Sequence, residues 1–178
     1  MINLSRLFEK SLGNQPLQAD ELLGLLQVSD GDLWELLPYS NRLREHTKGK
    51  RIKLCSIANV KNGSCSEDCG FCAQSAHFKT GVETYSYVGS EKVRLASDEA
   101  RENGACLGLV SQGWGLKRNK DREQIIADIA RLSPTRRVDA SLGILDEDDA
   151  RALKAAGLAC YNHNIETAPS YFFQVVGT

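Results

Sequence analysis

The hydrophobic positions in the first 47 residues recur every three or four residues, which is the period of an amphipathic helix. Three such runs predict helices over residues 3–12, over residues 18–28 and from Asp30 onward. Pro38 lies inside the third run, where a proline kinks or staggers a helix. Aliphatic stripes of this kind form part of a hydrophobic core more often than a binding site. We therefore expect residues 1–47 to form a small helical cap on the end of the domain that follows.

From residue 48 the pattern changes to short alternating runs that are separated by amphipathic segments. The predicted strands are residues 52–58, 105–111, 137–142 and 158–165, and the predicted helices are residues 90–103, 119–132 and 146–156. Strands that alternate with helices predict a parallel sheet with right-handed crossovers. Four strands do not close a barrel, so residues 48–178 are expected to form either an open α/β sheet or part of a larger barrel.

Composition and charge narrow the functional class. The chain has 178 residues, of which 42% are hydrophobic, and its net charge of −1 gives no electrostatic reason to expect a nucleic acid or an anionic membrane as partner. No stretch reaches the roughly 20 apolar residues that a membrane span requires. Residues 1–10 lack the apolar segment and cleavage site of a secretory signal. Six cysteines without an export signal predict a reducing, cytoplasmic location.

Three of these cysteines, Cys65, Cys69 and Cys72, fall within eight residues on the long connection that follows the first predicted strand. Connections of this length are often functional, and parallel sheets carry their chemistry at the carboxyl ends of the strands. Iron–sulfur clusters are held by thiolates. Three thiolates on a short loop can hold three irons of a [4Fe–4S] cluster and leave the fourth iron for a small molecule. We interpret the loop as a cluster site for the reductive cleavage of S-adenosylmethionine.

Three other interpretations of the cysteine motif remain open. A zinc site usually has a second pair of ligands, or three protein ligands and a water, and the sequence shows neither a second Cys-x2-Cys nor a spaced histidine pair. Disulfides belong to secreted proteins, which the N-terminus does not indicate. A chance grouping of structural thiols is the third alternative.

Two stretches of the sequence narrow the family to which the cysteine motif is assigned. Residues 59–78, which include the cysteines and the Gln-Ser-Ala-His sequence at 74–77, resemble the cluster loop of the biotin synthase family of radical S-adenosylmethionine enzymes. Residues 161–167 are similar to a second signature of that family, as are residues 141–145 and 153–157. The similarity covers roughly residues 45–178. The three-cysteine spacing alone would indicate only the wider radical superfamily.

The resemblance implies a TIM-type (βα) barrel, of which this α/β chain would supply the helical cap, residues 1–47, and about four βα units, residues 48–178. It implies sulfur insertion into dethiobiotin through a 5′-deoxyadenosyl radical. It further implies a flavodoxin or ferredoxin as electron donor and a homodimer. Because the later strands of the barrel would lie beyond residue 178, we expect the chain to correspond to the N-terminal half of the family.

The resemblance also assigns roles within the cysteine loop. Cys65, Cys69 and Cys72 would ligate the [4Fe–4S] cluster, and S-adenosylmethionine would bind the remaining iron. Phe71 resembles an aromatic residue that lies beside the adenine, although packing within the loop explains it equally well. His77 is expected to order the loop through a hydrogen bond.

A second group of predicted site residues belongs to the fourth strand. Asn162 and Asn164 would share one face of that strand, and their amides suit the ureido ring of dethiobiotin. Asn164 and Glu166 would contact the nucleotide, with Glu166 at the ribose hydroxyls. His163 would point to the opposite face, where a structural role is expected. The alternative for all of them is the ordinary polar end of a strand.

The sequence departs from the family where a second, [2Fe–2S] cluster is expected. The family's cysteine positions on the second and third strands fall at Gly108 and Asp139, and carboxylate is a poor substitute for thiolate on such a cluster. Cys106, two residues before Gly108 on the same face, is a possible ligand. Cys55 and Cys160 are expected to be small buried residues instead.

This departure leaves two alternatives to biotin synthase activity. One is a related radical enzyme that acts on another substrate without an auxiliary cluster, and the other is a non-catalytic iron–sulfur remnant. Gly113 and Gly115, which flank Trp114, form either a turn close to the nucleotide or an ordinary turn.

Overall fold

The structure is a computed structural model that describes residues 2–111 and 120–177. These residues form two compact units, with the boundary between Ile52 and Lys53. Among the described residues, no helix has both the length and the hydropathy needed to cross a bilayer.

The first unit contains the three helices that the hydrophobic pattern predicts. They are α1, Leu4–Leu12, α2, Ala19–Leu26, and α3, Asp30–Lys48. The Asn3 side chain caps α1 by accepting from the Arg6 amide, and the Ser29 hydroxyl caps α3 by accepting from the Asp32 amide. Helix α3 continues through Pro38.

The interior of this unit is small. Leu7 and Phe8 of α1 are buried, and the ring of Phe8 lies 5.5 Å from that of Tyr39 on α3. Helices α2 and α3 bury none of their residues. The large apolar side chains that remain exposed on them are Leu22, Leu23, Leu26, Leu33, Trp34 and Leu37. The expectation that the aliphatic stripes are core therefore holds for α1 but not for α2 and α3 within this unit, because three short helices have too little surface in mutual contact to cover them all.

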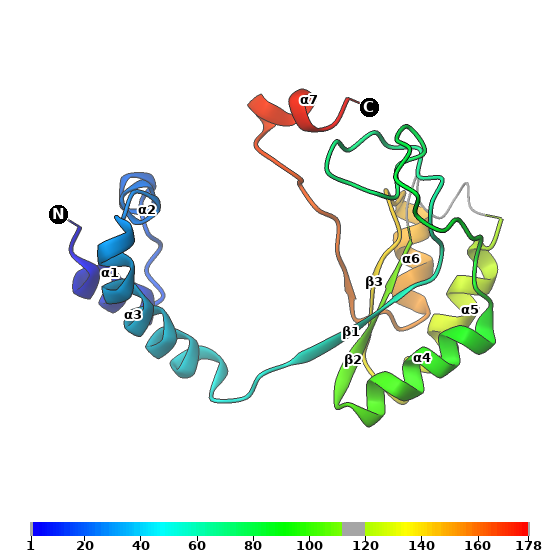
Figure 1. Cartoon of the computed structure of the whole chain (residues 1–178). Coiled ribbons are helices and arrows are strands. Elements are labelled where there is room, and N and C mark those ends of the chain that lie inside the picture. The colour runs from blue at the N-terminus through cyan, green and yellow to red at the C-terminus, as the bar shows by residue number, and fades with distance from the viewer. Residues whose placement is uncertain (1, 112–119, 178) are drawn as a thin grey trace. The chain divides into compact units, whose positions relative to one another are not determined.

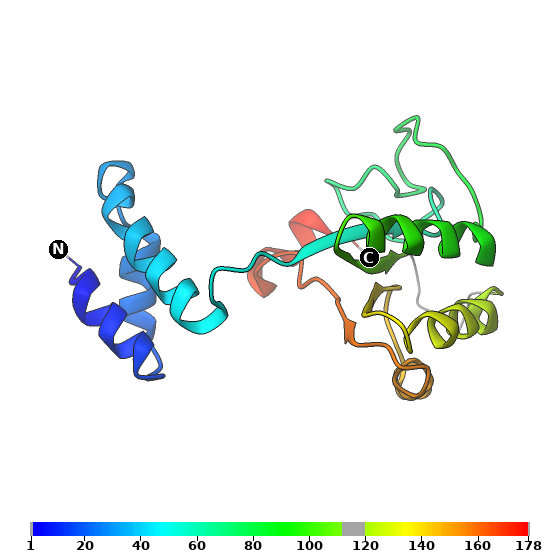
Figure 2. The same cartoon turned by 90° about the horizontal axis from the view of Figure 1, so that it is seen from below.

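The second unit is an α/β sheet of four parallel strands in the order β1-β2-β3-β4, as the alternating pattern predicts. The strands are β1, Leu54–Asn59, β2, Ala105–Val110, β3, Val138–Ser141, and β4, Cys160–Tyr161. The long helices are α4, Ser90–Glu102, α5, Arg122–Leu132, and α6, Glu147–Ala155. Figures 1 and 2 show these three helices on one side of the sheet. A 3-10 turn, Pro169–Tyr171, and the short helix α7, Phe172–Val175, follow β4.

The core lies between the sheet and these helices. Alternate strand residues point toward the helices and are at most 2% exposed; they are Leu107, Leu109, Val138 and Ala140. The helices contribute buried side chains at helical spacing; these include Val93, Ile125, Ile129 and Leu153. The core thus consists of every second residue of the strands and of helix residues spaced three or four apart.

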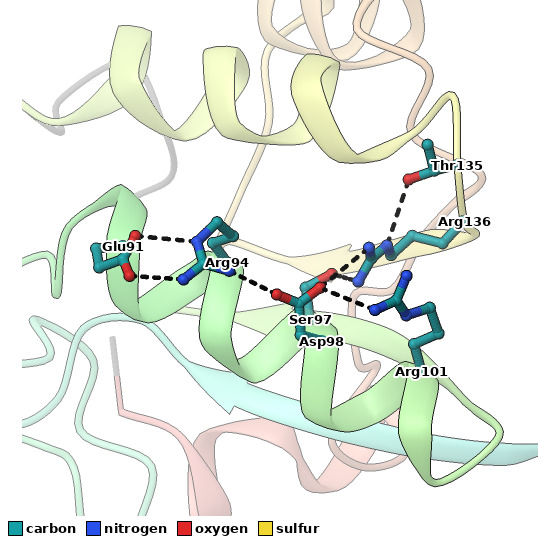
Figure 3. A network of polar contacts seen from close by, with 7 residues as sticks. All are labelled: Glu91, Arg94, Ser97, Asp98, Arg101, Thr135 and Arg136. Atoms are coloured by element: carbon teal, nitrogen blue, oxygen red, sulfur yellow. Dashed lines mark hydrogen bonds and ion pairs between the residues drawn. The ribbon is translucent and has the colours of Figure 1, made fainter.

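A polar network also attaches α4 to the turn before β3 (Figure 3). Arg94 pairs with Glu91 and Asp98, each at 2.7 Å. Arg136, from the turn, donates to the hydroxyl of Ser97, which is fully buried, and lies 3.4 Å from Asp98. The network supplements the apolar contacts of α4 with charge-assisted hydrogen bonds.

The fourth strand is much shorter than predicted. The ladder to β3 continues only as far as the Asn162 amide, which donates to the Ala140 carbonyl at 2.8 Å. The chain then leaves the sheet: the Thr167 amide donates to the Ile165 carbonyl at 2.8 Å, and Glu166 has φ +67°. Residues 162–166 therefore do not alternate between two faces as the predicted strand 158–165 requires.

Candidate functional site

The cysteines lie on a loop, residues 60–89, that joins the carboxyl end of β1 to α4 (Figure 1). Backbone hydrogen bonds close its base. Asn62 and Tyr85 exchange two of them, at 3.1 and 2.9 Å, and the Val88 amide donates to the Val60 carbonyl at 3.0 Å. The Asn62 side chain, which is buried, donates to the Glu83 carbonyl at 2.6 Å. The two ends of the loop are thus held together by hydrogen bonds.

Within the loop, the chain folds back on itself around the cysteines. The Cys65 amide donates to the Gln74 carbonyl at 3.0 Å, and the Ala76 amide donates to the Cys65 carbonyl at 2.9 Å. The Cys72 amide closes a turn by donating to the Cys69 carbonyl at 3.0 Å. A ring nitrogen of His77 lies 3.0 Å from the Ser66 carbonyl oxygen, which confirms the predicted ordering contact. The loop therefore has a defined backbone.

The three thiols are free, with Cys65 buried and Cys69 and Cys72 half-buried. Burial raises the pKa of the Cys69 thiol, and the Glu166 carboxylate and the thiols of Cys72 and Cys65 raise it further. Charge interactions of this kind act over short distances, so the three cysteines and Glu166 lie in one neighbourhood.

Thiols on an ordered loop at the carboxyl edge of the sheet are the donors that a [4Fe–4S] cluster requires, so the residues fit that group. Each cysteine of such a cluster binds a different iron. Among the residues outside 112–119 and the two end positions, no three His, Cys, Asp or Glu side chains are gathered as ligands of a single metal ion.

A contact that the sequence did not reveal joins the cysteine loop to residues 175–177. The Gly70 amide donates to the Val175 carbonyl at 2.8 Å, and the Gly177 amide donates to Oδ1 of Asp68 at 2.6 Å. Val176 is buried, and a Cβ atom on Gly177 would lie 2.4 Å from Oδ2 of Asp68. The only available signal was topological, because segments that follow parallel strands gather at the same edge.

The structure does not place all of the other predicted site residues where the sequence predicted them. Asn162, Asn164 and Glu166 are exposed and lie past the end of β4, so the shared strand face that we expected for them is wrong. Of these three, Glu166 interacts with the cysteine loop through Cys69. Phe71 is 63% exposed, and Gly113, Trp114 and Gly115 lie outside the described residues.

The side of the sheet that does not pack against α4, α5 and α6 carries most of the remaining sulfur. We call this side the thiol face; its residues are Cys55, Ile57, Cys106, Gly108, Asp139 and Cys160. Cys55 is opposite Cys106, Gly108 is opposite Asp139, and Asp139 is opposite Cys160. Cys55 is exposed and Cys160 is half-buried, so neither is the small buried residue that we predicted.

Charged groups surround Asp139 on this face. Its Oδ1 lies 2.8 Å from Nε of Arg137, and its Oδ2 lies 3.5 Å from Nζ of Lys53. The carboxylate that replaces the expected cysteine is therefore already paired with two cations. Burial raises the pKa of the Cys55 thiol, and a hydrogen bond with Cys106 raises it further.

Comparison with known proteins confirms the predicted resemblance. The chain is 41% identical over 159 residues to a biotin synthase of Pelobacter propionicus, covering 88% of this chain and 48% of that protein. It is 36% identical over 180 residues to a biotin synthase of Geotalea daltonii, covering 99% and 55% respectively. A biotin synthase of Natronomonas pharaonis is 42% identical over 150 residues. The chain spans about half the length of these relatives, in agreement with the predicted N-terminal half. No protein-family model matches the sequence.

Solved structures give a weaker likeness. SuiB of Streptococcus suis, in a crystal structure bound to S-adenosylmethionine, has a TM-score of 0.49 and 14% sequence identity, over 85% of this chain and 35% of that one. A second structure of SuiB, bound to the precursor peptide SuiA, has a TM-score of 0.48.

Proposed function

We propose that the chain is the cluster-binding half of a radical S-adenosylmethionine enzyme of the biotin synthase type. The observation that carries this proposal is the ordered loop with three free thiols at the carboxyl edge of the sheet, in a chain that resembles biotin synthases along most of its length. In this proposal the sheet is part of a barrel, and the helices of the first unit cap it.

Cys65, Cys69 and Cys72 would hold the [4Fe–4S] cluster as thiolates. When bound, the cluster and S-adenosylmethionine supply a 5′-deoxyadenosyl radical by one-electron cleavage of a sulfur–carbon bond. The chain itself positions these groups. The bonds of Asn62 and Val60 fix the base of the loop, and those of residues 175–177 fix its Asp68–Gly70 side.

The exposed residues after β4 would complete the site. Glu166, already near Cys69, is suited to the ribose hydroxyls of the nucleotide, and Phe71 to its adenine. Asn162 and Asn164 would offer amide donors and acceptors to dethiobiotin. The whole enzyme would insert sulfur into dethiobiotin in the cytoplasm, take electrons from a flavodoxin or ferredoxin, and pair as a homodimer.

One observation favours a second candidate, a related radical enzyme without the [2Fe–2S] cluster. Gly108 and Asp139 occupy the positions where that cluster's cysteines are expected, and Asp139 is paired with Arg137 and Lys53. These residues do not fit the auxiliary cluster, although Cys106 lies nearby on the thiol face.

Anaerobic reconstitution with iron and sulfide tests the proposal. We expect about four irons for each chain and the formation of 5′-deoxyadenosine from S-adenosylmethionine under a strong reductant. Cys65→Ala, Cys69→Ala and Cys72→Ala should each abolish both results, whereas Cys160→Ala, outside the loop, should leave them unchanged. Binding of zinc in place of iron, or wild-type iron content in all three loop variants, would contradict the proposal.

Dethiobiotin separates the two candidates. For an enzyme of the biotin synthase type, we expect it to increase the rate of 5′-deoxyadenosine formation, and we expect Asn162→Ala to reduce that increase. Cleavage of the nucleotide that is insensitive to dethiobiotin, with no iron beyond about four for each chain, would favour the related enzyme.

A further inference from the structure

Two thiols outside the cysteine loop lie directly opposite each other on neighbouring strands. Cys55 of β1 and Cys106 of β2 are partners in the parallel register, and both are free. Neighbouring strands are about 4.8 Å apart. A disulfide joins Cα atoms that are roughly 4.4 to 6.8 Å apart, so the backbone spacing suits a bridge between these two residues.

The side chains also approach each other. Both belong to the thiol face, and the thiol of Cys106 is near enough to that of Cys55 to raise its pKa. Gly108, next to them, has no side chain, and a Cβ atom there would lie 3.7 Å from the sulfur of Cys55. This distance is an ordinary van der Waals contact, and it places the sulfur of Cys55 over the second strand.

No such geometry links Cys106 to Cys160. Cys160 is opposite Asp139 of β3, so it lies two strands away from Cys106. Two strand spacings are about 9.6 Å, which is too far for a disulfide without movement of the backbone. The register therefore selects one pair of thiols on this face.

The surroundings allow a reagent to reach the pair. Cys55 is exposed and Cys106 is half-buried. Lys53 and Arg137 face the pair with positive charge, and Asp139 lies between them with negative charge. Burial, Cys106 and Asp139 keep the pKa of the Cys55 thiol raised and outweigh Lys53, which lowers it, so the fraction of reactive thiolate grows as the pH rises.

We propose that Cys55 and Cys106 form a dithiol site that reacts with low-molecular-weight disulfides and closes to a Cys55–Cys106 disulfide. The Cys55 thiolate attacks one sulfur of oxidised glutathione, which breaks the glutathione disulfide and releases one glutathione thiolate. The Cys106 thiolate then attacks the sulfur of Cys55 and releases the second. The protein loses two electrons, the oxidant becomes two glutathione molecules, and the two cysteine protons pass to them.

Closure of this bond would join β1 covalently to β2 just before the cysteine loop begins at residue 60. It requires no residue of that loop and no bound cluster. Failure of this inference would therefore not contradict the proposed function, and failure of the proposed function would not contradict this inference.

Disulfide mapping of the full chain after treatment with oxidised glutathione tests the inference. Trypsin cuts after Lys and Arg, and this places Cys55 in peptide 54–61, Cys106 in peptide 102–117, Cys160 in peptide 155–178 and the three loop cysteines in peptide 62–79. We expect a cross-link between peptides 54–61 and 102–117. It should exceed the glutathione adducts of either peptide by about tenfold, because the second step is intramolecular.

Single variants identify the pair. In Cys55→Ser the peptide 102–117 should carry glutathione and no cross-link, and in Cys106→Ser the same should hold for peptide 54–61. Cys160→Ala is the matched control and should leave the cross-link unchanged. Separate glutathione adducts on Cys55 and Cys106 in the wild-type chain, or a cross-link of either to another peptide in its place, would overturn the inference. Far-ultraviolet circular dichroism checks that each variant is folded.

Discussion

The two faces of the sheet differ in what their side chains do. On the face that packs against α4, α5 and α6, residues such as Leu109 and Val138 are at most 1% exposed and belong to the hydrophobic core. On the thiol face, one residue farther along the same strands, Ile57 is 67% exposed and the other side chains are thiols, a carboxylate and a glycine. Burial of apolar area stabilises the first face, whereas the second buries less apolar area and leaves Cys55 exposed and Cys106 and Cys160 half-buried.

This difference shows how one sheet can serve two purposes. Because successive side chains of a strand point to opposite faces, packing and chemistry can evolve at alternating positions without disturbing each other. The same strands also end at one edge, where the cysteine loop begins, so the position of that loop depends on the packed face. Substitutions on the two faces should therefore have unequal effects.

The largest effect is expected from Leu109→Ala, set against Ile57→Ala on the thiol face. Leu109 is 1% exposed, and its truncation leaves a cavity that should lower the free energy of unfolding by about 2–5 kcal/mol. Ile57 is 67% exposed, and its truncation should change the free energy of unfolding by no more than about 0.5 kcal/mol. Urea unfolding followed by circular dichroism measures both. Equal losses would show that something covers the thiol face as well.

A smaller effect is expected from Arg136→Ala in the network of Figure 3. The Arg136 side chain is 16% exposed, and its removal takes away the partner of the buried Ser97 hydroxyl, which should cost about 1–2 kcal/mol. Arg101→Ala is the control, because that side chain is 65% exposed and lies 3.8 Å from Asp98. Its loss should cost at most about 0.5 kcal/mol. Thermal unfolding of the two variants tests the ranking, which a larger loss for Arg101→Ala would refute.

A third effect, confined to alkaline pH, concerns Tyr161, on the packed face opposite Ala140. Burial raises the pKa of its hydroxyl to about 12, above the value of about 10 for an unfolded tyrosine. The folded chain therefore retains this proton when the unfolded chain loses it. The stabilisation is complete below pH 10 and decreases as the pH rises from about 10 to 12.

Tyr161→Phe removes this titrating group, so its free energy of unfolding should fall less steeply with pH in that window than that of the wild-type chain. Urea titrations at several pH values measure the two slopes. Tyr171→Phe, at a tyrosine that is 50% exposed, is the matched control. Identical slopes for the wild type and Tyr161→Phe would show that the Tyr161 hydroxyl is not protected.

Much of the fold could be predicted from the sequence because it depends on local periodicity. The hydrophobic pattern predicted every long helix in the described residues and all four strands, and the alternation of strand and helix predicted a parallel sheet. The cysteine spacing and the residues around it predicted the family resemblance that the comparisons confirm. Such patterns can be recognised in a sequence because the buried face of a helix or strand requires apolar residues at regular intervals.

The errors arose where neighbours in space decide the outcome. Residues 158–165 have the composition of a strand, but only Cys160 and Tyr161 form one, because pairing ends with the short partner β3. The apolar residues of α2 and α3 have the spacing of a core, but the first unit alone does not bury them. In both cases the local sequence pattern agreed with the prediction, but the neighbouring element did not offer enough surface for the predicted pairing or burial.

The sequence by itself determined the helices, the strands and the three cysteines at the end of β1. Only the tertiary structure showed that Gly70 and Asp68 are bonded to residues 175–177, and that Cys55 is opposite Cys106 across β1 and β2. The physical reason is that a helix or strand is specified by intervals of a few residues. The register between strands and the contacts of a loop instead join positions about 50 to 110 residues apart, and packing of the whole sheet selects them.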